Sequence, residues 1–110
     1  MAAKSDLLQG TLDLIVLRVL SLGPRHGYGI ALRIRQISQE VLQVNQGSLC
    51  PAMLRLEQRG WIKSSWGTTD TGREAKFFEL TRAGRKQLAL ERENWERVKG
   101  AIGRLMEAVE

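Results

Sequence analysis

The sequence predicts a mainly α-helical fold that contains one small β-hairpin. Apolar residues recur at the three- and four-residue spacing of an amphipathic helix in four separate segments. Between the third and fourth segments, two short runs rich in β-branched and aromatic residues flank a loop of turn-forming residues, which is typical of a hairpin. The chain has 110 residues and no internal repeat, so one compact folded unit is expected.

Two helices are expected in the first third of the chain. The first covers about residues 8–22 and ends before Pro24, because proline disfavours helical geometry in the residue that precedes it. The second covers about residues 27–38, where Gly27 and Gly29 weaken the first turn and indicate close packing or close approach to a ligand. The apolar positions that predict these helices are Leu8, Leu12, Ile15, Val16, Val19, Leu20, Ile30, Ile34 and Ile37.

A short edge strand is expected over residues 40–44, which include two β-branched valines. The polar stretch that follows supplies the cap of a third helix, which runs to about Arg59. Pro51 has no backbone N–H and is best tolerated in a first helical turn, which favours Ser48 over Asn45 as the capping residue. The inner face of this helix consists of Leu49, Ala52, Met53 and Leu56.

The hairpin is expected from strands over residues 61–66 and 75–81, joined by the loop 67–72. Its tip carries Arg73, and its return strand carries Lys76.

Thr81 is a good cap for a long final helix over residues 82–110. This helix is long for so small a domain, and its apolar stripe needs a second surface to cover it. The same helix of a second subunit is the simplest choice. We therefore expect residues 1–81 to form the folded domain and the last helix to mediate dimerisation. The expected interface residues are Trp95, Val98, Ile102 and Leu105.

The charge of the chain is strongly basic, with 17 Lys and Arg against 12 Asp and Glu and a net charge of +5. A basic domain attracts polyanions through the release of their counterions. The single cysteine excludes an intramolecular disulfide and a multi-cysteine zinc site. No phosphate-binding loop or nucleophile–base pair is evident, so we expect no enzyme, no cofactor and no metal. The lack of a signal peptide or a long apolar run predicts a cytoplasmic protein with no membrane association.

Helix, helix, helix, hairpin, helix is the element order of a winged helix-turn-helix. In that arrangement the third helix enters the major groove of double-stranded DNA, and the hairpin reaches the phosphates beside it. Small and polar residues on the exposed face of the third helix allow its backbone to approach the DNA. The expected DNA-contacting residues are Tyr28, Gln46, Ser48, Cys50, Pro51, Arg55, Arg73 and Lys76.

Two other functions compete with DNA binding. A winged helix is able to bind another protein through the same surface, since fold does not determine function. That surface would then be neutral or apolar, whereas this one carries four cations, which favours DNA. RNA binding lacks the aromatic-rich sheet on which bases stack. The four cations are Arg55, Arg59, Arg73 and Lys76.

An ordered set of motifs over about residues 7–98 resembles the PadR family of transcriptional regulators. The resemblance implies a winged-helix repressor, usually a homodimer, that binds a palindromic operator. Some members release DNA when a small phenolic or aromatic compound binds, and members with Trp at the position of Trp95 suggest that paired Trp95 side chains line such an effector site. The motifs are His26-Gly27-Tyr28-Gly29-Ile30, Gly47-Ser48-Leu49-Cys50-Pro51-Ala52-Met53, Arg55-Leu56-Glu57, Gly60-Trp61-Ile62 and Lys76-Phe77-Phe78-Glu79-Leu80-Thr81.

Cys50 departs from the family pattern, which has tyrosine at this position of the third helix. A thiol does not reach as far as a phenol hydroxyl, so the departure implies weaker DNA binding or a contact supplied elsewhere. Oxidation of the thiol to a bulky or charged adduct would oppose DNA binding and make this residue a redox sensor. The interpretation that we favour is a neutral replacement by a small residue.

Overall fold

The computed structural model describes residues 2–109, with side chains described from residue 10 onward. Its described part contains four helices and one antiparallel sheet, in which the strand order is β1-β3-β2. The predicted mainly helical fold with a hairpin is therefore confirmed. The elements are α1 (Ala2–Ser21), β1 (Arg25–His26), α2 (Gly27–Ile37), α3 (Gln46–Gln58), β2 (Ile62–Thr68), β3 (Glu74–Leu80) and α4 (Arg82–Glu107).

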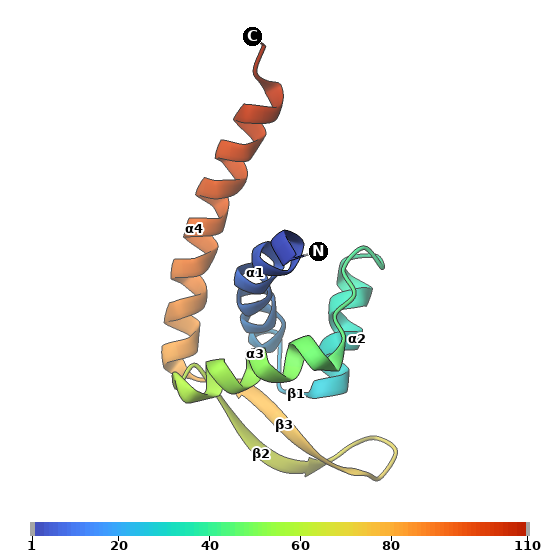
Figure 1. The fold of residues 1–110 in the computed structure, drawn as a ribbon. Coiled ribbons are helices and arrows are strands. Elements are labelled where there is room, and N and C mark those ends of the chain that lie inside the picture. The colour runs from blue at the N-terminus through green and yellow to red at the C-terminus, as the bar shows by residue number, and fades with distance from the viewer. Residues whose placement is uncertain (1, 110) are drawn as a thin grey trace.

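The centre of the domain is α1, which lies among the other three helices above the sheet (Figure 1). Its apolar residues, from Leu12 to Leu20, pack against the inner faces of α2 and α3 and against the sheet. Burial of this apolar surface is the main force that holds the elements together. The largest fully buried side chains are Val16, Leu17, Leu20, Ile30, Leu49, Leu56 and Ile62.

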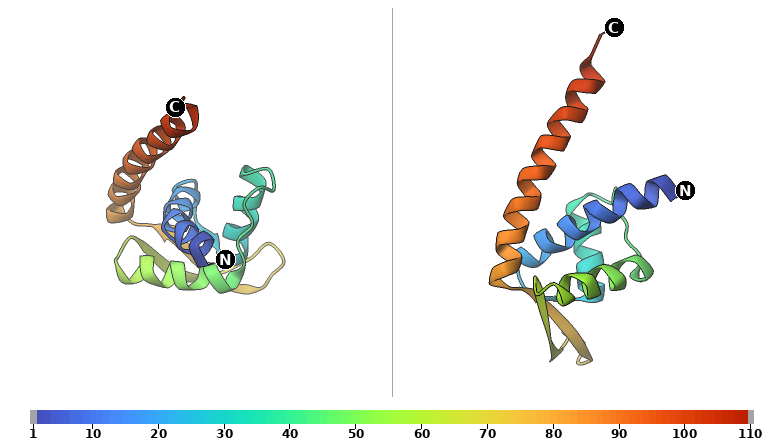
Figure 2. Two further views of the ribbon diagram at one scale, coloured as in Figure 1. Left: turned by 45° about the horizontal axis from the view of Figure 1, so that its top comes forward. Right: turned by 60° about the vertical axis from the view of Figure 1, so that its left-hand side comes forward.

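The sheet has a third strand that the sequence did not predict. Strand β1 pairs with β3 through Arg25 opposite Phe78 and His26 opposite Phe77, while β2 and β3 form the expected hairpin. This hairpin extends away from the helices and forms the wing, which we define as β2, β3 and the loop between them (Figure 2). Because β1 directly precedes α2, it ties the base of the wing to the start of that helix.

Helix α4 leaves the body of the domain and projects far beyond it, so the molecule measures 59 × 28 × 24 Å (Figures 1 and 2). The predicted cap is confirmed: the Thr81 hydroxyl oxygen accepts a hydrogen bond from the Gly84 N–H at 3.0 Å. The same hydroxyl donates to the Gly60 carbonyl at 2.6 Å. The start of α4 is thus fixed to the end of α3 and the base of the wing.

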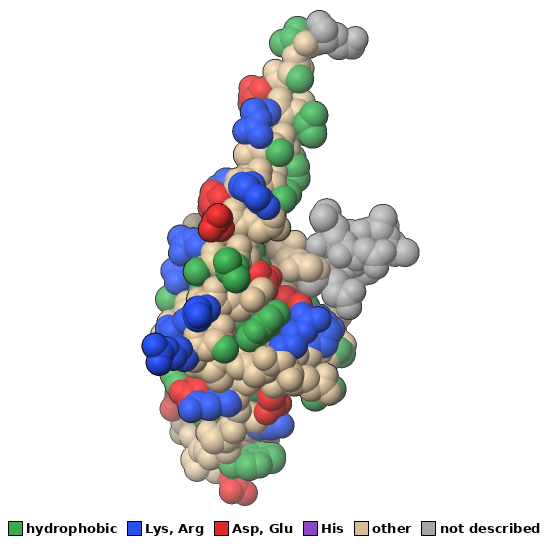
Figure 3. All heavy atoms as spheres, turned by 90° about the vertical axis from the view of Figure 1, so that its left-hand side faces the viewer, with side chains coloured by type: hydrophobic (Ala, Val, Ile, Leu, Met, Phe, Trp, Pro, Cys, Tyr) green, Lys and Arg blue, Asp and Glu red, His purple; other side chains and the backbone are tan. Residues whose placement is uncertain are grey.

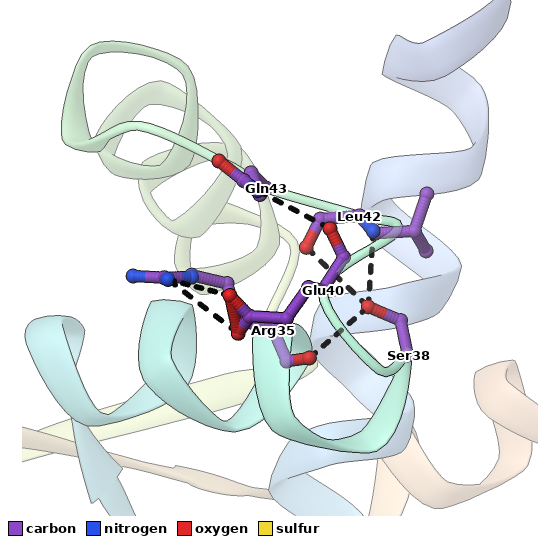
Figure 4. A network of polar contacts seen from close by, with 5 residues as sticks. All are labelled: Arg35, Ser38, Glu40, Leu42 and Gln43. Carbon is purple, nitrogen blue, oxygen red and sulfur yellow. Dashed lines mark hydrogen bonds and ion pairs between the residues drawn. The ribbon is translucent and has the colours of Figure 1, made fainter.

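The expected strand over residues 40–44 is wrong. Gln39 and Glu40 adopt left-handed backbone conformations, with φ of 54° and 72°, which reverse the chain directly after α2. Arg35 holds the reversed segment through an ion pair to the Glu40 carboxylate at 2.8 Å, and this carboxylate raises the pKa of the guanidinium. The Ser38 hydroxyl oxygen accepts the Leu42 N–H at 3.0 Å (Figure 4). These local contacts take the place of strand pairing.

The start of α3 also differs from the expectation. Asn45, not Ser48, is the capping residue: its side-chain oxygen accepts the Ser48 N–H at 2.8 Å. Pro51 consequently lies inside the helix, where its missing N–H removes the hydrogen bond to the Gly47 carbonyl. Both residues are exposed, so water can hydrate that carbonyl and lessen the cost of the proline.

Candidate nucleic-acid interface

The outer face of α3 is the first component of the site. Its inner face is buried in the core, which leaves the first half of the opposite face open to solvent. The predicted residues Gln46, Ser48, Cys50 and Pro51 all lie exposed there, close to the helix N-terminus. The unpaired N–H groups of such a terminus favour anions such as phosphate. Small side chains at these positions allow the backbone of α3 to approach a ligand closely.

Gly27 lies where the start of α2 meets the start of α3. A Cβ atom at position 27 would lie 3.4 Å from the Gln46 Oε1 atom and 3.5 Å from a methyl group of Met53, which are ordinary contact distances, so an alanine would fit here. The Cys50 thiol points toward the same Gln46 oxygen, with a separation of 3.8 Å. Packing between the two helices therefore does not require the glycine expected for a close contact at this position.

Tyr28 is the second component, and 69% of it is exposed at the start of α2. Its ring is stacked beside the His26 ring at 6.4 Å between centroids, and the His26 ring also meets Phe77 edge to face. The Nδ1 atom of His26 accepts the Gly29 N–H at 3.1 Å, so this histidine caps α2. Among the described residues, no group of three metal-ligating side chains is present.

The wing is the third component and lies beside α3. Ser64 donates a hydrogen bond to the Glu57 carboxylate at 2.6 Å, and Lys76 lies 3.9 Å from the same carboxylate. These contacts connect α3 to the strands of the wing. Arg73 is exposed at the end of the wing loop, and its side chain has no polar partner within the described part of the chain. The wing thus brings Lys76 to the second half of α3, while Arg73 lies at the wing loop opposite α2.

Arg55 is placed differently from the other expected contacts. Its guanidinium donates to the Asp13 carboxylate at 2.9 Å, and the exposed fractions of the two side chains are 31% and 15%. The ion pair directs Arg55 toward α1, away from the outer face of α3. Its observed contact is one that positions α3 on α1.

The second half of α4 carries an apolar stripe that the rest of the domain does not cover. Trp95 is 39% exposed, and exposure increases along the stripe to 77% at Met106. Figure 3 shows hydrophobic side chains along one side of the projecting helix and charged side chains on the other. The expected interface residues Trp95, Val98, Ile102 and Leu105 all belong to this stripe.

Within residues 2–109, no helix is long and apolar enough to cross a membrane.

Two arginines near the site were not singled out from the sequence. Arg25 in β1 and Arg33 in α2 line a groove between α2 and the wing loop, together with Tyr28 and Arg73. The sequence does not indicate that these two arginines lie near the wing loop, because β1, which pairs with β3 of the wing, was not predicted.

Comparison with known proteins places this geometry in a family. The model of the transcriptional regulator PadR-like family matches residues 16–90, more than half of the chain. The chain is 30% identical over 107 residues to the Uncharacterized protein X of Lysinibacillus sphaericus, a match that covers 97% of this chain and 98% of that one.

Solved structures show the same fold. A transcriptional regulator from Clostridium thermocellum superimposes with a TM-score of 0.82 at 32% identity, over 90% of this chain and 96% of that one. A PadR-like transcriptional regulator from Bacillus cereus superimposes with a TM-score of 0.81 at 22% identity, over 94% and 99% of the two chains. The described fold is thus that of a winged helix-turn-helix with a long C-terminal helix, and the chain belongs to the PadR-like family of transcriptional regulators.

Proposed function

We propose that this regulator is a homodimeric repressor that binds a palindromic operator through α3 and the wing. Regulators of this family bind DNA. The observation that carries the proposal is an exposed, small-residue face on α3, a helix against which the wing packs, with exposed Arg73 and Lys76 on that wing. An α-helix fits the major groove of DNA, and cations beside it reach the phosphates. We assign the DNA contacts to Tyr28, Gln46, Ser48, Cys50, Pro51, Arg73 and Lys76, and to Arg55 only if its ion pair with Asp13 opens.

Residues 1–81 form the DNA-binding domain in this proposal, and residues 82–110 form the dimerisation helix. An apolar stripe on a projecting helix supports the division, because soluble monomers rarely expose large contiguous apolar patches. Two-fold pairing of α4 would place two recognition helices on one duplex. A two-fold protein of this kind binds a DNA site with matching two-fold symmetry.

Removal of the Lys76 charge tests the role of the wing. We expect Lys76→Ala to weaken binding to duplex DNA and to reduce the slope of log affinity against log salt by about 1, because one phosphate contact is lost. The measurement is a titration of a labelled fragment of the DNA upstream of its own gene, with unrelated DNA as competitor, over a salt series. Lys99→Ala is the control, since Lys99 is an exposed lysine on α4. Equal salt slopes for the two variants would show that the wing is not part of the DNA interface.

Trp95 is our proposed contact for a small aromatic effector that relieves repression. In a dimer built on α4, the two Trp95 side chains would face a shared apolar surface on which a planar compound stacks. We expect planar aromatic compounds to quench tryptophan fluorescence in the native chain and not in Trp95→Phe. Trp61 and Trp66 remain as internal references in that variant. Quenching of equal size in the variant would place the effector site elsewhere.

A further inference from the structure

A groove of about 790 Å³ lies between α2 and the wing loop, beside the proposed DNA interface. Three arginines from three different elements line it: Arg25 from β1, Arg33 from α2 and Arg73 from the end of the wing loop. Figure 1 shows the start of α2 facing the wing loop, so the fold brings these segments together although they are far apart in the chain. The groove therefore collects guanidinium groups from separate parts of the sequence.

Two of these guanidinium groups have buried donors with no acceptor. The Nε atoms of Arg25 and Arg33 are inaccessible to solvent and make no hydrogen bond within the described residues. The Arg33 side chain donates a hydrogen bond from Nη1 to the Gln36 side-chain oxygen at 3.3 Å. A buried N–H group without an acceptor is destabilising, and native structures rarely leave one unpaired. Because both Nε atoms are closed to solvent, an oxyanion in the groove supplies acceptors to them when the guanidinium groups turn toward it.

The other charges of the groove limit the kind of anion that fits. Asp70 and Glu74 also line it, yet neither forms an ion pair within 4.0 Å of any arginine in the described part of the chain. The arginines outnumber the carboxylates by one, so a singly charged oxyanion matches the groove better than a dianion. A phosphodiester carries a single negative charge and presents free oxygens, which suit guanidinium donors.

We propose that this groove binds one backbone phosphodiester of the DNA that flanks the base pairs read by α3. The inference rests on the proposed function, since it extends the same interface beyond the wing. Tyr28 and Arg73 support the assignment, because both line the groove and both belong to the proposed DNA contacts. Arg25 and Arg33 then act as phosphate-binding residues that fix the position of the domain on the duplex.

The test observes the two donors directly. The Nε–H signals of Arg25 and Arg33 are assigned in the NMR spectrum of the ¹⁵N-labelled protein by their loss in Arg25→Lys and Arg33→Lys. The protein is then titrated with duplex DNA of random sequence and, separately, with inorganic phosphate. Random-sequence DNA is sufficient because phosphate contacts are made in non-specific binding as well. We expect both signals to shift with DNA, while the signal of Arg92, an exposed residue of α4, does not.

Affinity measurements provide the second readout. Arg33→Gln is expected to reduce the salt slope of DNA binding by about 1, and Arg92→Gln, which removes the same charge from α4, is expected to leave it unchanged. DNA binding with unmoved Arg25 and Arg33 signals and an unchanged Arg33→Gln slope overturns the inference and leaves the proposed function standing. Signals that move with inorganic phosphate in a protein that does not bind DNA show a small-anion site, which overturns both the phosphodiester assignment and the proposed function.

Discussion

Ile102→Glu is expected to dissociate the proposed dimer while the winged-helix domain stays folded. Ile102 lies in the middle of the apolar stripe of α4 and is 48% exposed in the single chain, so a glutamate there is hydrated in the monomer. In a dimer paired through α4 the same carboxylate would lose its water without gaining a partner, which costs several kcal/mol. We expect the dimerisation constant to weaken by at least about 100-fold, as measured by sedimentation equilibrium.

The matched control for this variant is Arg104→Glu. Arg104 is exposed and lies two residues further along α4, roughly half a turn of the helix around from Ile102. This substitution places the same side chain on the charged face and changes the net charge by more than Ile102→Glu does. We expect Arg104→Glu to remain dimeric. Dimers of equal strength for the two variants would contradict pairing through the apolar stripe.

Gly84→Ala is expected to destabilise the domain by about 3 kcal/mol and to lower Tm by about 12–24 °C. Gly84 is buried in the first turn of α4. A Cβ atom here would overlap the backbone carbonyl of Trp61 and lie 2.8 Å from a methyl group of Leu80. Because a backbone carbonyl cannot rotate away like a flexible side chain, α4 would have to shift and give up the hydrogen bond from Gly84 to Thr81. Thermal unfolding followed by circular dichroism measures the change.

Gly103→Ala is the control for this substitution because it makes the same change in the same helix. A Cβ atom at position 103 would meet no other atom within 4 Å. Alanine favours the helix over glycine by about 1 kcal/mol, so the Tm is expected to stay the same or to rise. A similar loss of stability in both variants would show that the helix itself, and not the contact with Trp61, determines the effect.

The sequence predicts the elements of this fold well wherever its patterns are long. The helical spacing of apolar residues identifies α1 to α4, and the Thr81 cap is where the sequence places it. The strand expected over residues 40–44 fails because strand propensity says nothing about whether a neighbouring strand is available. The predicted cap of α3, Ser48, is wrong because the prediction relied on the preference of Pro51 for a first helical turn. The observed cap is Asn45, whose side-chain oxygen accepts the Ser48 N–H.

The candidate site is less predictable than the fold, because it depends on contacts between distant residues. Arg55 was expected at the DNA surface, but its partner Asp13 lies 42 positions earlier in the chain and belongs to α1. Arg25 and Arg33 are the opposite case, since they line the groove beside the site although no sequence pattern singles them out. They come close to the wing loop only because β1 pairs with β3 in the folded domain.

Selection of bound sequences from a library of randomised DNA duplexes measures sequence-specific binding by a dimer without assuming an operator. We expect enrichment of an inverted repeat whose half-sites are separated by about one helical turn, 10–10.5 base pairs, or a multiple of it. We also expect two chains to bind each selected duplex, as measured by native mass spectrometry. No enrichment over the starting library, or an asymmetric site that one chain occupies, would contradict a dimeric, sequence-specific regulator.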